Sequence, residues 1–211
     1  QFCTNPGLVL AIDGPDLARF LAAASEAVSA ASAQTMLTPG ISEAYRTGVG
    51  HLSGNARVRP VATGLAAGGA TQGQAALFET GAADFLADPA LSEEVFGAAS
   101  LVIRCRDVAE MRALTERMEG QLTATVQMEA GDAEDVRHLL PALERRAGRI
   151  LVNGWPTGVE VCHAMVHGGP YPSTSDGRST SVGTLAIRRF LRPVCYQDLP
   201  AALLPDSLRD G

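Results

Sequence analysis

Lysine is absent from this chain of 211 residues, and all 17 of its basic residues are arginines. Without a lysine amine the chain cannot form a Schiff base or attach pyridoxal phosphate. It also cannot build a Walker-type phosphate loop, whose motif requires Gly-Lys-Ser/Thr. The glycine-rich run at residues 64–69 also departs from the GxGxxG pattern, so we interpret it as a flexible connection.

Long apolar runs are also missing, since no stretch approaches the roughly 18 uninterrupted apolar residues of a membrane span. The first residues lack a signal-peptide pattern. A net charge of −6 without a basic stripe argues against nucleic acid as a partner. The four cysteines lie far apart with no CxxC pair, at Cys3, Cys105, Cys162 and Cys195. We therefore expect a cytoplasmic protein with reduced thiols and no membrane partner.

Short apolar runs alternate with amphipathic stretches along most of the chain. Strands are predicted at residues 8–12, 58–63, 74–80, 100–105, 122–128 and 149–152, and helices at 15–28, 41–52, 107–120 and 132–148. We expect Gly120 and Gly148 to close the last two helices, and Pro141 to kink the last one or end it early. This order predicts one α/β domain with a mostly parallel sheet, helices on both faces, and ligands at the carboxyl ends of the strands.

Periodicity disappears from Asn153 to Ser181, which is rich in Gly, Pro, Ser and Thr. A long loop of this composition is often functional. A short helix at 182–189, a strand at 190–196 and a loosely docked tail at 198–211 complete the prediction. Because an exposed strand edge invites pairing with another chain, the strand at 190–196 leaves open a second reading: a non-catalytic, stand-alone assembly module.

Cys3 precedes a turn (Asn5-Pro6-Gly7) and the first predicted strand, a position that suits a nucleophile. Alone this is weak evidence, but further motifs follow it. They are QFCT at 1–4, EEVFG at 93–97, VNG at 152–154 and HGGP at 167–170. In this order and spacing they resemble the C-terminal, thiol-bearing domain of the NAD(P)-dependent aldehyde dehydrogenase superfamily, over essentially all of residues 1–211.

The segment from Asn153 to Pro172 resembles one subgroup of that superfamily, the 2-oxoglutarate-semialdehyde (2,5-dioxopentanoate) dehydrogenases. The resemblance implies oxidation of a small aldehyde substrate with NADP or NAD, through a thiohemiacetal and then a thioester that water hydrolyses. Thiolates are strong nucleophiles near neutral pH, which suits this chemistry. The resemblance also implies a homo-oligomer, assembled through the C-terminal strand.

By the same resemblance, Cys3 is the catalytic nucleophile and its backbone N–H is an oxyanion donor. Glu94 is expected to bind the nicotinamide-ribose hydroxyls, and Phe96 to pack beside the nicotinamide ring. Phe2 is a candidate for the aldehyde pocket. Trp155 is another, although core packing is an equally good interpretation of a single tryptophan.

The chain also departs from the family pattern. The family's general base, a Glu in a Glu-Leu-Gly-Gly segment, has no counterpart, and Ala98 replaces the usual Pro after Gly97. The second oxyanion donor and the cofactor-binding Lys are missing as well. We therefore expect this chain to need the N-terminal half of a parent enzyme, which would bind most of the cofactor, and to be inactive alone.

Other chemistry is less well supported by the sequence. Cys162, His163 and His167 match no standard zinc spacing, so we expect no metal site. A cysteine hydrolase is disfavoured because no His follows Cys3 in a hydrolase-like motif. We interpret Cys105 and Cys195 as inert thiols in apolar strands. Arg178 is expected to form a structural ion pair rather than to meet a substrate carboxylate.

Overall fold

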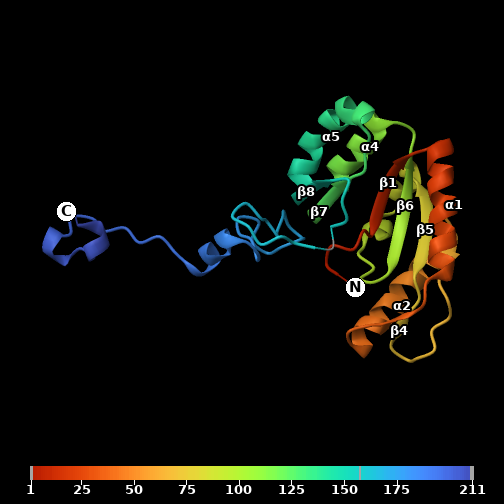
Figure 1. Ribbon diagram of the computed structural model, residues 1–211, viewed down its shortest axis with the longest axis horizontal. Coiled ribbons are helices and arrows are strands. Elements are labelled where there is room, and N and C mark those ends of the chain that lie inside the picture. The colour runs from red at the N-terminus through yellow and green to blue at the C-terminus, as the bar shows by residue number, and fades with distance from the viewer. Residues whose placement is uncertain (1, 157, 210–211) are drawn as a thin grey trace.

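A four-stranded sheet lies inside the folded body in a computed structural model that describes residues 2–156 and 158–209 (Figure 1). Its strand order is β1-β6-β5-β3. The strands are β1 (Leu8–Ile12), β3 (Arg59–Thr63), β5 (Ala76–Gly81) and β6 (Ala99–Cys105). β1, β6 and β5 are parallel, and β3 joins the edge of β5 antiparallel.

Helices cover both faces of this sheet. On one face α1 (Pro15–Ala30) contributes Leu17 to a core with Leu77 and Val102. The other face is covered by α2 (Pro39–Gly54), α3 (Ala82–Ala87) and α4 (Val108–Arg117), whose apolar side chains pack against alternate residues of the same strands. Successive side chains of a strand point to opposite faces of the sheet, so alternate strand residues belong to two separate cores. The predicted α/β class with helices on both faces is confirmed.

A second, two-stranded parallel sheet holds β7 (Gln121–Val126) and β8 (Ala147–Val152), connected by α5 (Ala133–Arg146). The predicted order of strands and helices is therefore found, but the strands do not form one continuous sheet. β6 already pairs with β1 on one side and β5 on the other, so β7 has no free edge of β6 to join. Short elements complete this part: β2 (Gln34–Thr35), β4 (Gln72–Gly73), η1 (Pro89–Ser92) and η2 (Ala130–Asp132).

Two predictions about helix ends are wrong. α4 is followed by Met118 in an extended conformation, so Gly120 does not close it. α5 ends at Arg146, and Gly148 lies inside β8. α5 also continues through Pro141, with Ala142 still on its buried face, so the helix does not end early there; the alternative of a kink stays a prediction. Gly120 and Gly148 instead lie where the backbone of residues 168–170 approaches most closely.

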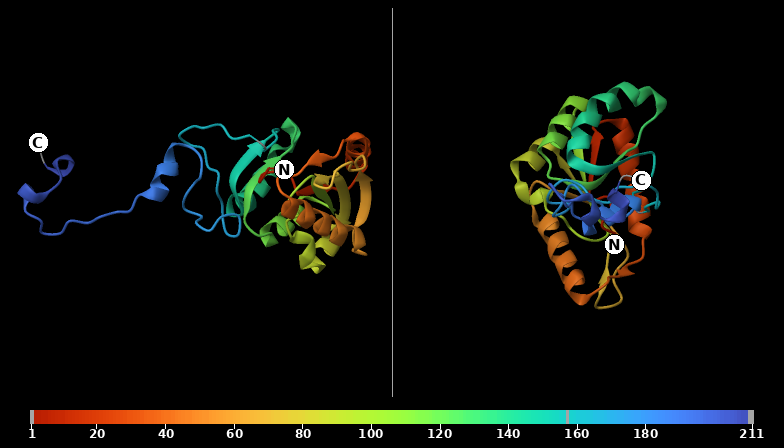
Figure 2. Two further views of the ribbon diagram at one scale, coloured as in Figure 1. Left: turned by 90° about the horizontal axis from the view of Figure 1, so that it is seen from below. Right: turned by 90° about the vertical axis from the view of Figure 1, so that its left-hand side faces the viewer.

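After β8 the chain leaves the sheets. The expected helix at 182–189 is a 3-10 helix, η3 (Thr184–Phe190), and two short ones follow, η4 (Ala201–Leu203) and η5 (Asp206–Leu208). The strand predicted at 190–196 is not formed, because Phe190 ends η3 and residues 191–197 have no regular structure. The tail extends away from the body (Figure 1 and the left view of Figure 2). Among the described residues, no helix has the length and apolar character needed to cross a membrane.

Candidate active site

Cys3 lies in a turn directly before β1, and it is exposed. The backbone N–H of Asn5 donates to the carbonyl of Phe2 at 3.0 Å and closes the turn. The next residue, Thr4, is buried, and its hydroxyl donates to the carbonyl of Pro156 at 2.7 Å. The thiol therefore projects from a turn that is held on both sides, while Gln1 of the same motif lies outside the described residues.

The segment carrying Glu94 and Phe96 is bonded to this turn. The Asn5 side-chain amide donates to the carbonyl of Gly97 at 2.9 Å. Since β1 and β6 are adjacent and parallel, the segments that precede them meet at one edge of the sheet. Phe96 is half-buried there and Glu94 is exposed.

α2 packs against the Glu94–Phe96 segment and the glycine that follows it. The ring of Tyr45 packs so closely on Gly97 that an added Cβ would lie 2.4 Å from a ring carbon. Val95 likewise rests against Gly48, where an added Cβ would lie 3.0 Å away. The Tyr45 hydroxyl donates to the carbonyl of Gln74, and burial raises its pKa to about 12. The segment is thus seated on a rigid, buried aromatic ring.

The carboxyl end of β8 approaches the Cys3 turn from the other side. Asn153, in a left-handed conformation (φ 52°), joins the ends of β8 and β7 by exchanging two 2.8 Å hydrogen bonds with the backbone of Met128. Pro156 then accepts the Thr4 bond. Its neighbour Trp155 is 72% exposed, and Phe2 is 61% exposed. Phe2 is thus adjacent to Cys3 in the chain, whereas Trp155 is brought to the Cys3 turn by the bond between Thr4 and Pro156, and neither is packed into a core.

His167 is the residue that sequence reasoning missed. Its Nε2 lies 3.5 Å from the Sγ of Cys3, although 164 positions separate the two residues. On the sequence alone we consider His167 as a metal ligand, reject that role, and assign it no catalytic one. No spacing rule connects it to Cys3, because a long irregular loop brings it there. Its place before two glycines of the HGGP motif was the one available signal.

The environment of the His167 ring indicates its tautomer. Nδ1 is buried and has no hydrogen-bond partner among the described residues. An orphaned buried N–H is rarer in proteins than an under-satisfied acceptor, so the proton is better placed on Nε2. From Nε2 it points to the sulfur of Cys3. With the proton on Nε2, the imidazole can donate a hydrogen bond to the sulfur of Cys3.

The remaining predictions about side chains have mixed outcomes. Cys105 is fully buried, and burial together with the nearby Glu110 and Asp107 raises the pKa of its thiol to about 11. Cys195, expected to be buried in a strand, is exposed because the tail leaves the body. Arg178 lies 3.8 Å from Asp176, as expected for an ion pair. Within the described part of the chain, no three His, Cys, Asp or Glu side chains could hold a metal ion together.

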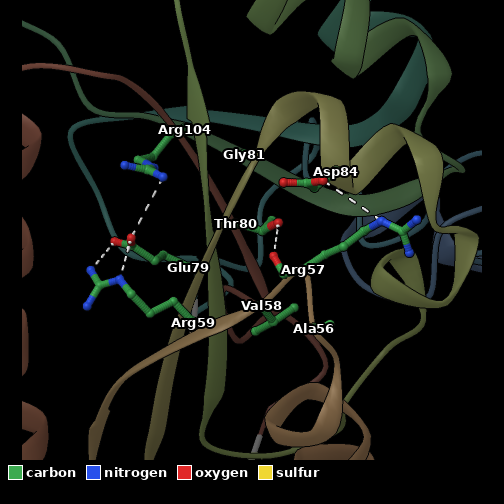
Figure 3. A pocket seen from close by; sticks show the side chains of 9 residues that line it. All are labelled: Ala56, Arg57, Val58, Arg59, Glu79, Thr80, Gly81, Asp84 and Arg104. Atoms are coloured by element: carbon green, nitrogen blue, oxygen red, sulfur yellow. Dashed lines mark hydrogen bonds and ion pairs between the residues drawn. The ribbon is translucent and has the colours of Figure 1, made fainter.

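A cavity of about 430 Å³ opens at the opposite edge of the sheet, at the carboxyl ends of β5 and β6 (Figure 3). Glu79 projects into it with a side chain that is only 5% exposed. Arg59 forms a bidentate ion pair with that carboxylate, from Nε to Oε1 and from Nη2 to Oε2, each at 2.7 Å. The Nη2 of Arg104 lies 4.0 Å from Oε1. Of the candidate residues, only Trp155 follows the carboxyl end of a strand, β8, whereas Cys3 precedes β1, and Glu94 and Phe96 precede β6.

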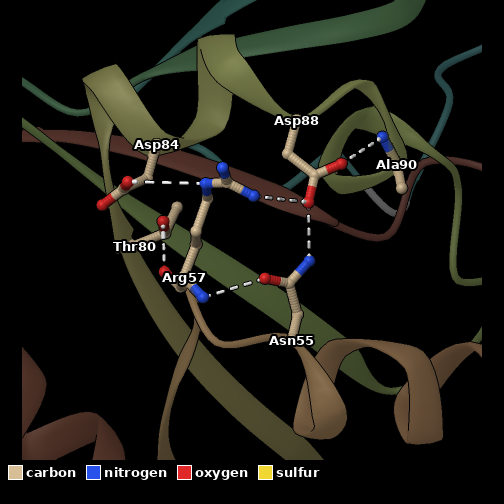
Figure 4. A network of polar contacts seen from close by, with 6 residues as sticks. All are labelled: Asn55, Arg57, Thr80, Asp84, Asp88 and Ala90. Carbon is tan, nitrogen blue, oxygen red and sulfur yellow. Dashed lines mark hydrogen bonds and ion pairs between the residues drawn. The ribbon is translucent and has the colours of Figure 1, made fainter.

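A polar network continues along this edge (Figure 4). The guanidinium of Arg57 lies 3.8 Å from Asp84 and 3.7 Å from Asp88. Asn55 donates to Asp88 at 2.8 Å, and this bond holds the pKa of Asp88 below its ordinary value. The positive and negative groups here balance one another. We interpret the edge as structural.

Comparison with known proteins finds close relatives. The chain is 60% identical over 211 residues to an alpha-ketoglutaric semialdehyde dehydrogenase 2 from Azospirillum brasilense. It is 46% identical over 212 residues to an alpha-ketoglutaric semialdehyde dehydrogenase from Acinetobacter baylyi. Each match covers all of this chain and 40% of the relative. No family model matches.

Solved structures share the fold at low sequence identity. A succinic semialdehyde dehydrogenase from Streptococcus pyogenes in complex with NADP+ aligns with a TM-score of 0.70 at 15% identity, over 88% of this chain and 40% of that one. A salicylaldehyde dehydrogenase from Pseudomonas putida G7 aligns with a TM-score of 0.66 at 19% identity, over 90% and 40% of the two chains. The same architecture thus recurs in proteins longer than this chain.

Proposed function

Since this chain belongs over its whole length to the aldehyde dehydrogenase superfamily, we propose that it carries the catalytic thiol of an enzyme that oxidises 2-oxoglutarate semialdehyde to 2-oxoglutarate. The observation that best supports a nucleophilic role is the contact between Cys3 and His167. An exposed thiol with an imidazole nitrogen 3.5 Å away has the arrangement of an activated nucleophile. The named substrate rests on the two relatives with 60% and 46% identity.

Cys3 attacks the aldehyde carbon in this proposal. Its sulfur forms a bond to that carbon, and the carbonyl oxygen becomes negatively charged. In this step the backbone N–H of Cys3 would donate to the oxygen. His167, whose Nε2 lies 3.5 Å from the sulfur, holds the attacking group in position. Phe2 and Trp155, both exposed beside the turn, would line the entry of the aldehyde.

The Glu94–Phe96 segment fits the nicotinamide end of a dinucleotide. Glu94 presents an exposed carboxylate that can accept from a ribose diol. Phe96 offers an aromatic wall on the segment that Asn5 ties to the Cys3 turn. NAD or NADP, when bound, would supply the hydride acceptor for the oxidation. Glu94 and Phe96 would hold the nicotinamide end of the cofactor on the segment bonded to the Cys3 turn.

Other parts of the active site are proposed to come from outside these 211 residues. The chain spans 40% of the length of the curated relatives it matches. It holds no counterpart of the family's Glu-Leu-Gly-Gly base segment, which would activate water for release of the acid. We propose that this chain works as the C-terminal catalytic domain of a longer enzyme.

The exposed tail supports a proposal about assembly. Leu191 is 66% exposed and Val194 is 56% exposed, in a segment without a strand partner among the described residues. Apolar side chains on an extended segment are suited to pairing with another strand. We propose that residues 190–196 join a second copy of the enzyme. If Cys3 proved unreactive, assembly would remain as the non-catalytic function of this fold.

The full-length protein tests the catalytic proposal with a panel of aldehydes and both cofactors. Cys3→Ala should lower aldehyde oxidation by about 10³-fold or more, because the covalent path is lost. Cofactor binding should persist, since the thiol contributes little to it. Cys162→Ala is the matched control, an exposed thiol on the loop, and should keep wild-type activity. Full activity of the Cys3→Ala enzyme would contradict the proposal.

A further inference from the structure

The imidazole of His167 reaches Cys3 from a segment without helix or strand. An irregular loop samples many conformations unless specific contacts hold it, and ordering it costs conformational entropy. A distance of 3.5 Å between Nε2 and Sγ therefore requires support from elsewhere in the fold. Two sets of contacts supply this support.

Thr180 and Ser181 bond both backbone polar groups of His167. The His167 N–H donates to the Thr180 hydroxyl oxygen at 2.8 Å, and that hydroxyl donates onward to the carbonyl of Val182 at 2.7 Å. Ser181 donates twice to the His167 carbonyl, from its N–H and from its hydroxyl, each at 3.0 Å. Thr180 is only 5% exposed, so water does not compete for its bonds.

The residues that follow His167 lie directly on the first residues of β7 and β8. A Cβ added to Gly148 would lie 2.1 Å from the carbonyl oxygen of Gly168. One added to Gly120 would lie 2.1 Å from the carbonyl oxygen of Pro170. Real Cβ contacts essentially never fall below 3.0 Å, so both positions need glycine for this crossing to form. The glycines whose helix-closing role proved wrong thus serve the loop.

We propose that Thr180 is a positioning residue for the nucleophile and acts through His167. The Thr180 hydroxyl, together with the glycine crossing at Gly120 and Gly148, sets the distance between the imidazole and the thiol. This inference rests on the proposed role of Cys3, and it adds the residues that hold its activating group. It also gives the irregular 153–181 loop a specific task.

The test compares Thr180→Val with Thr180→Ser in the full-length protein. Valine keeps nearly the same volume but loses the hydroxyl, whereas serine keeps the hydroxyl. The readout is the rate at which iodoacetamide labels Cys3 at fixed pH, measured by peptide mass spectrometry. We expect labelling about tenfold slower in Thr180→Val, because one directed hydrogen bond to the loop is lost, and near wild type in Thr180→Ser.

Thr184→Val is the matched control. It removes another threonine hydroxyl of the same region, which contacts the Nδ1 of His163 at 2.7 Å. Labelling of Cys3 should be unchanged in this variant. If Thr180→Val does not fold, Ser181→Ala takes its place, since Ser181 is exposed and its loss leaves the backbone bond to His167. A two- to threefold slower rate, about 0.5 kcal/mol, is expected there.

A double-mutant cycle with His167→Phe separates positioning from general damage. If Thr180 acts through His167, the double variant should label no more slowly than His167→Phe alone. The inference would be overturned if the rate reductions of Thr180→Val and His167→Phe multiplied in the double variant. It would also be overturned if Thr180→Val labelled at the wild-type rate while wild-type Cys3 labels quickly. A wild-type Cys3 that labels no faster than Cys162 would instead contradict the proposed nucleophile, and the positioning role with it.

Discussion

The Asn5 side-chain amide donates a hydrogen bond to the carbonyl of Gly97 at 2.9 Å, across 92 positions of the chain. It connects the turn that carries Cys3 with the segment that carries Glu94 and Phe96. The two segments precede β1 and β6, which pair in parallel from Leu8 opposite Leu101. The bond and the strand pairing thereby fix the predicted nucleophile, Cys3, relative to the predicted cofactor-binding residues Glu94 and Phe96.

Replacing Asn5 by alanine should affect cofactor use more than folding. Without the bond the Glu94–Phe96 segment loses its tie to the thiol turn, so KM for the cofactor should rise and kcat fall, together by about tenfold in kcat/KM. The free energy of unfolding should fall by about 1 kcal/mol. Asn55→Ala is the control, since its 2.8 Å bond to Asp88 lies on the opposite edge of the sheet. It should cost stability and leave both constants unchanged.

Substitution of His167 should distinguish a hydrogen-bond donor from a bulky neighbour. Phenylalanine keeps an aromatic ring without the N–H, and iodoacetamide should label Cys3 about tenfold more slowly in that variant. Glutamine retains an N–H donor on a side chain of comparable reach and should recover part of the rate. His163→Phe, on the same loop, should label like the wild type. Equal rates in all three variants would remove His167 from the proposal.

In the ion pair between Arg59 and Glu79, losing the arginine should lower the free energy of unfolding more than losing the carboxylate. Glu79 is 5% exposed, whereas Arg59 is 62% exposed. Arg59→Met leaves a buried carboxylate with only Arg104 near it, and we expect a loss of about 2–4 kcal/mol in the free energy of unfolding. Glu79→Gln leaves an arginine that water solvates, and the loss should stay near 1 kcal/mol. Urea unfolding of both variants decides this, and an equal cost would contradict it.

Alkaline pH should destabilise the protein through Cys105. Burial raises the pKa of this thiol from 9.0 to about 11, so the folded state favours the protonated form. The stability that the protonated thiol contributes is fully present below pH 9. It is lost as pH rises towards 11, at up to about 1.4 kcal/mol of unfolding free energy per pH unit. The difference in unfolding free energy between wild type and Cys105→Ala should shrink over this window. A difference that stays constant from pH 8 to 11 would show that the thiol does not titrate there.

Local pattern was enough to predict most elements of the fold. The strand at 8–12 and the helix that begins at Pro15 were found where the apolar spacing indicated. Asp107, the first residue of the helix predicted at 107–120, caps α4 by accepting from the N–H of Glu110. These features depend on neighbours along the chain, which is why the sequence reveals them. The predicted roles of Cys3, Glu94 and Phe96 came from a motif resemblance, and they stay predictions.

The errors arose where distant segments compete for the same space. Gly120 and Gly148 looked like helix ends, because a glycine after an amphipathic run usually is one. Their actual use depends on residues 168–170, which no local pattern connects to them. The separation of β7 and β8 into their own sheet has a similar origin. It follows from both edges of β6 being taken, a fact about pairing partners rather than about the strands themselves.

The sequence by itself determined the α/β class, the order of strands and helices, and a cysteine on a turn before the first strand. It did so because period, turn residues and capping residues act within a few positions. Only the tertiary structure decided which histidine meets Cys3, and which threonine and glycines hold that histidine in place. The physical reason is that Cys3 and His167 are 164 positions apart, so their contact depends on how the sheets position the Cys3 turn and on the hydrogen bonds that hold the loop of His167.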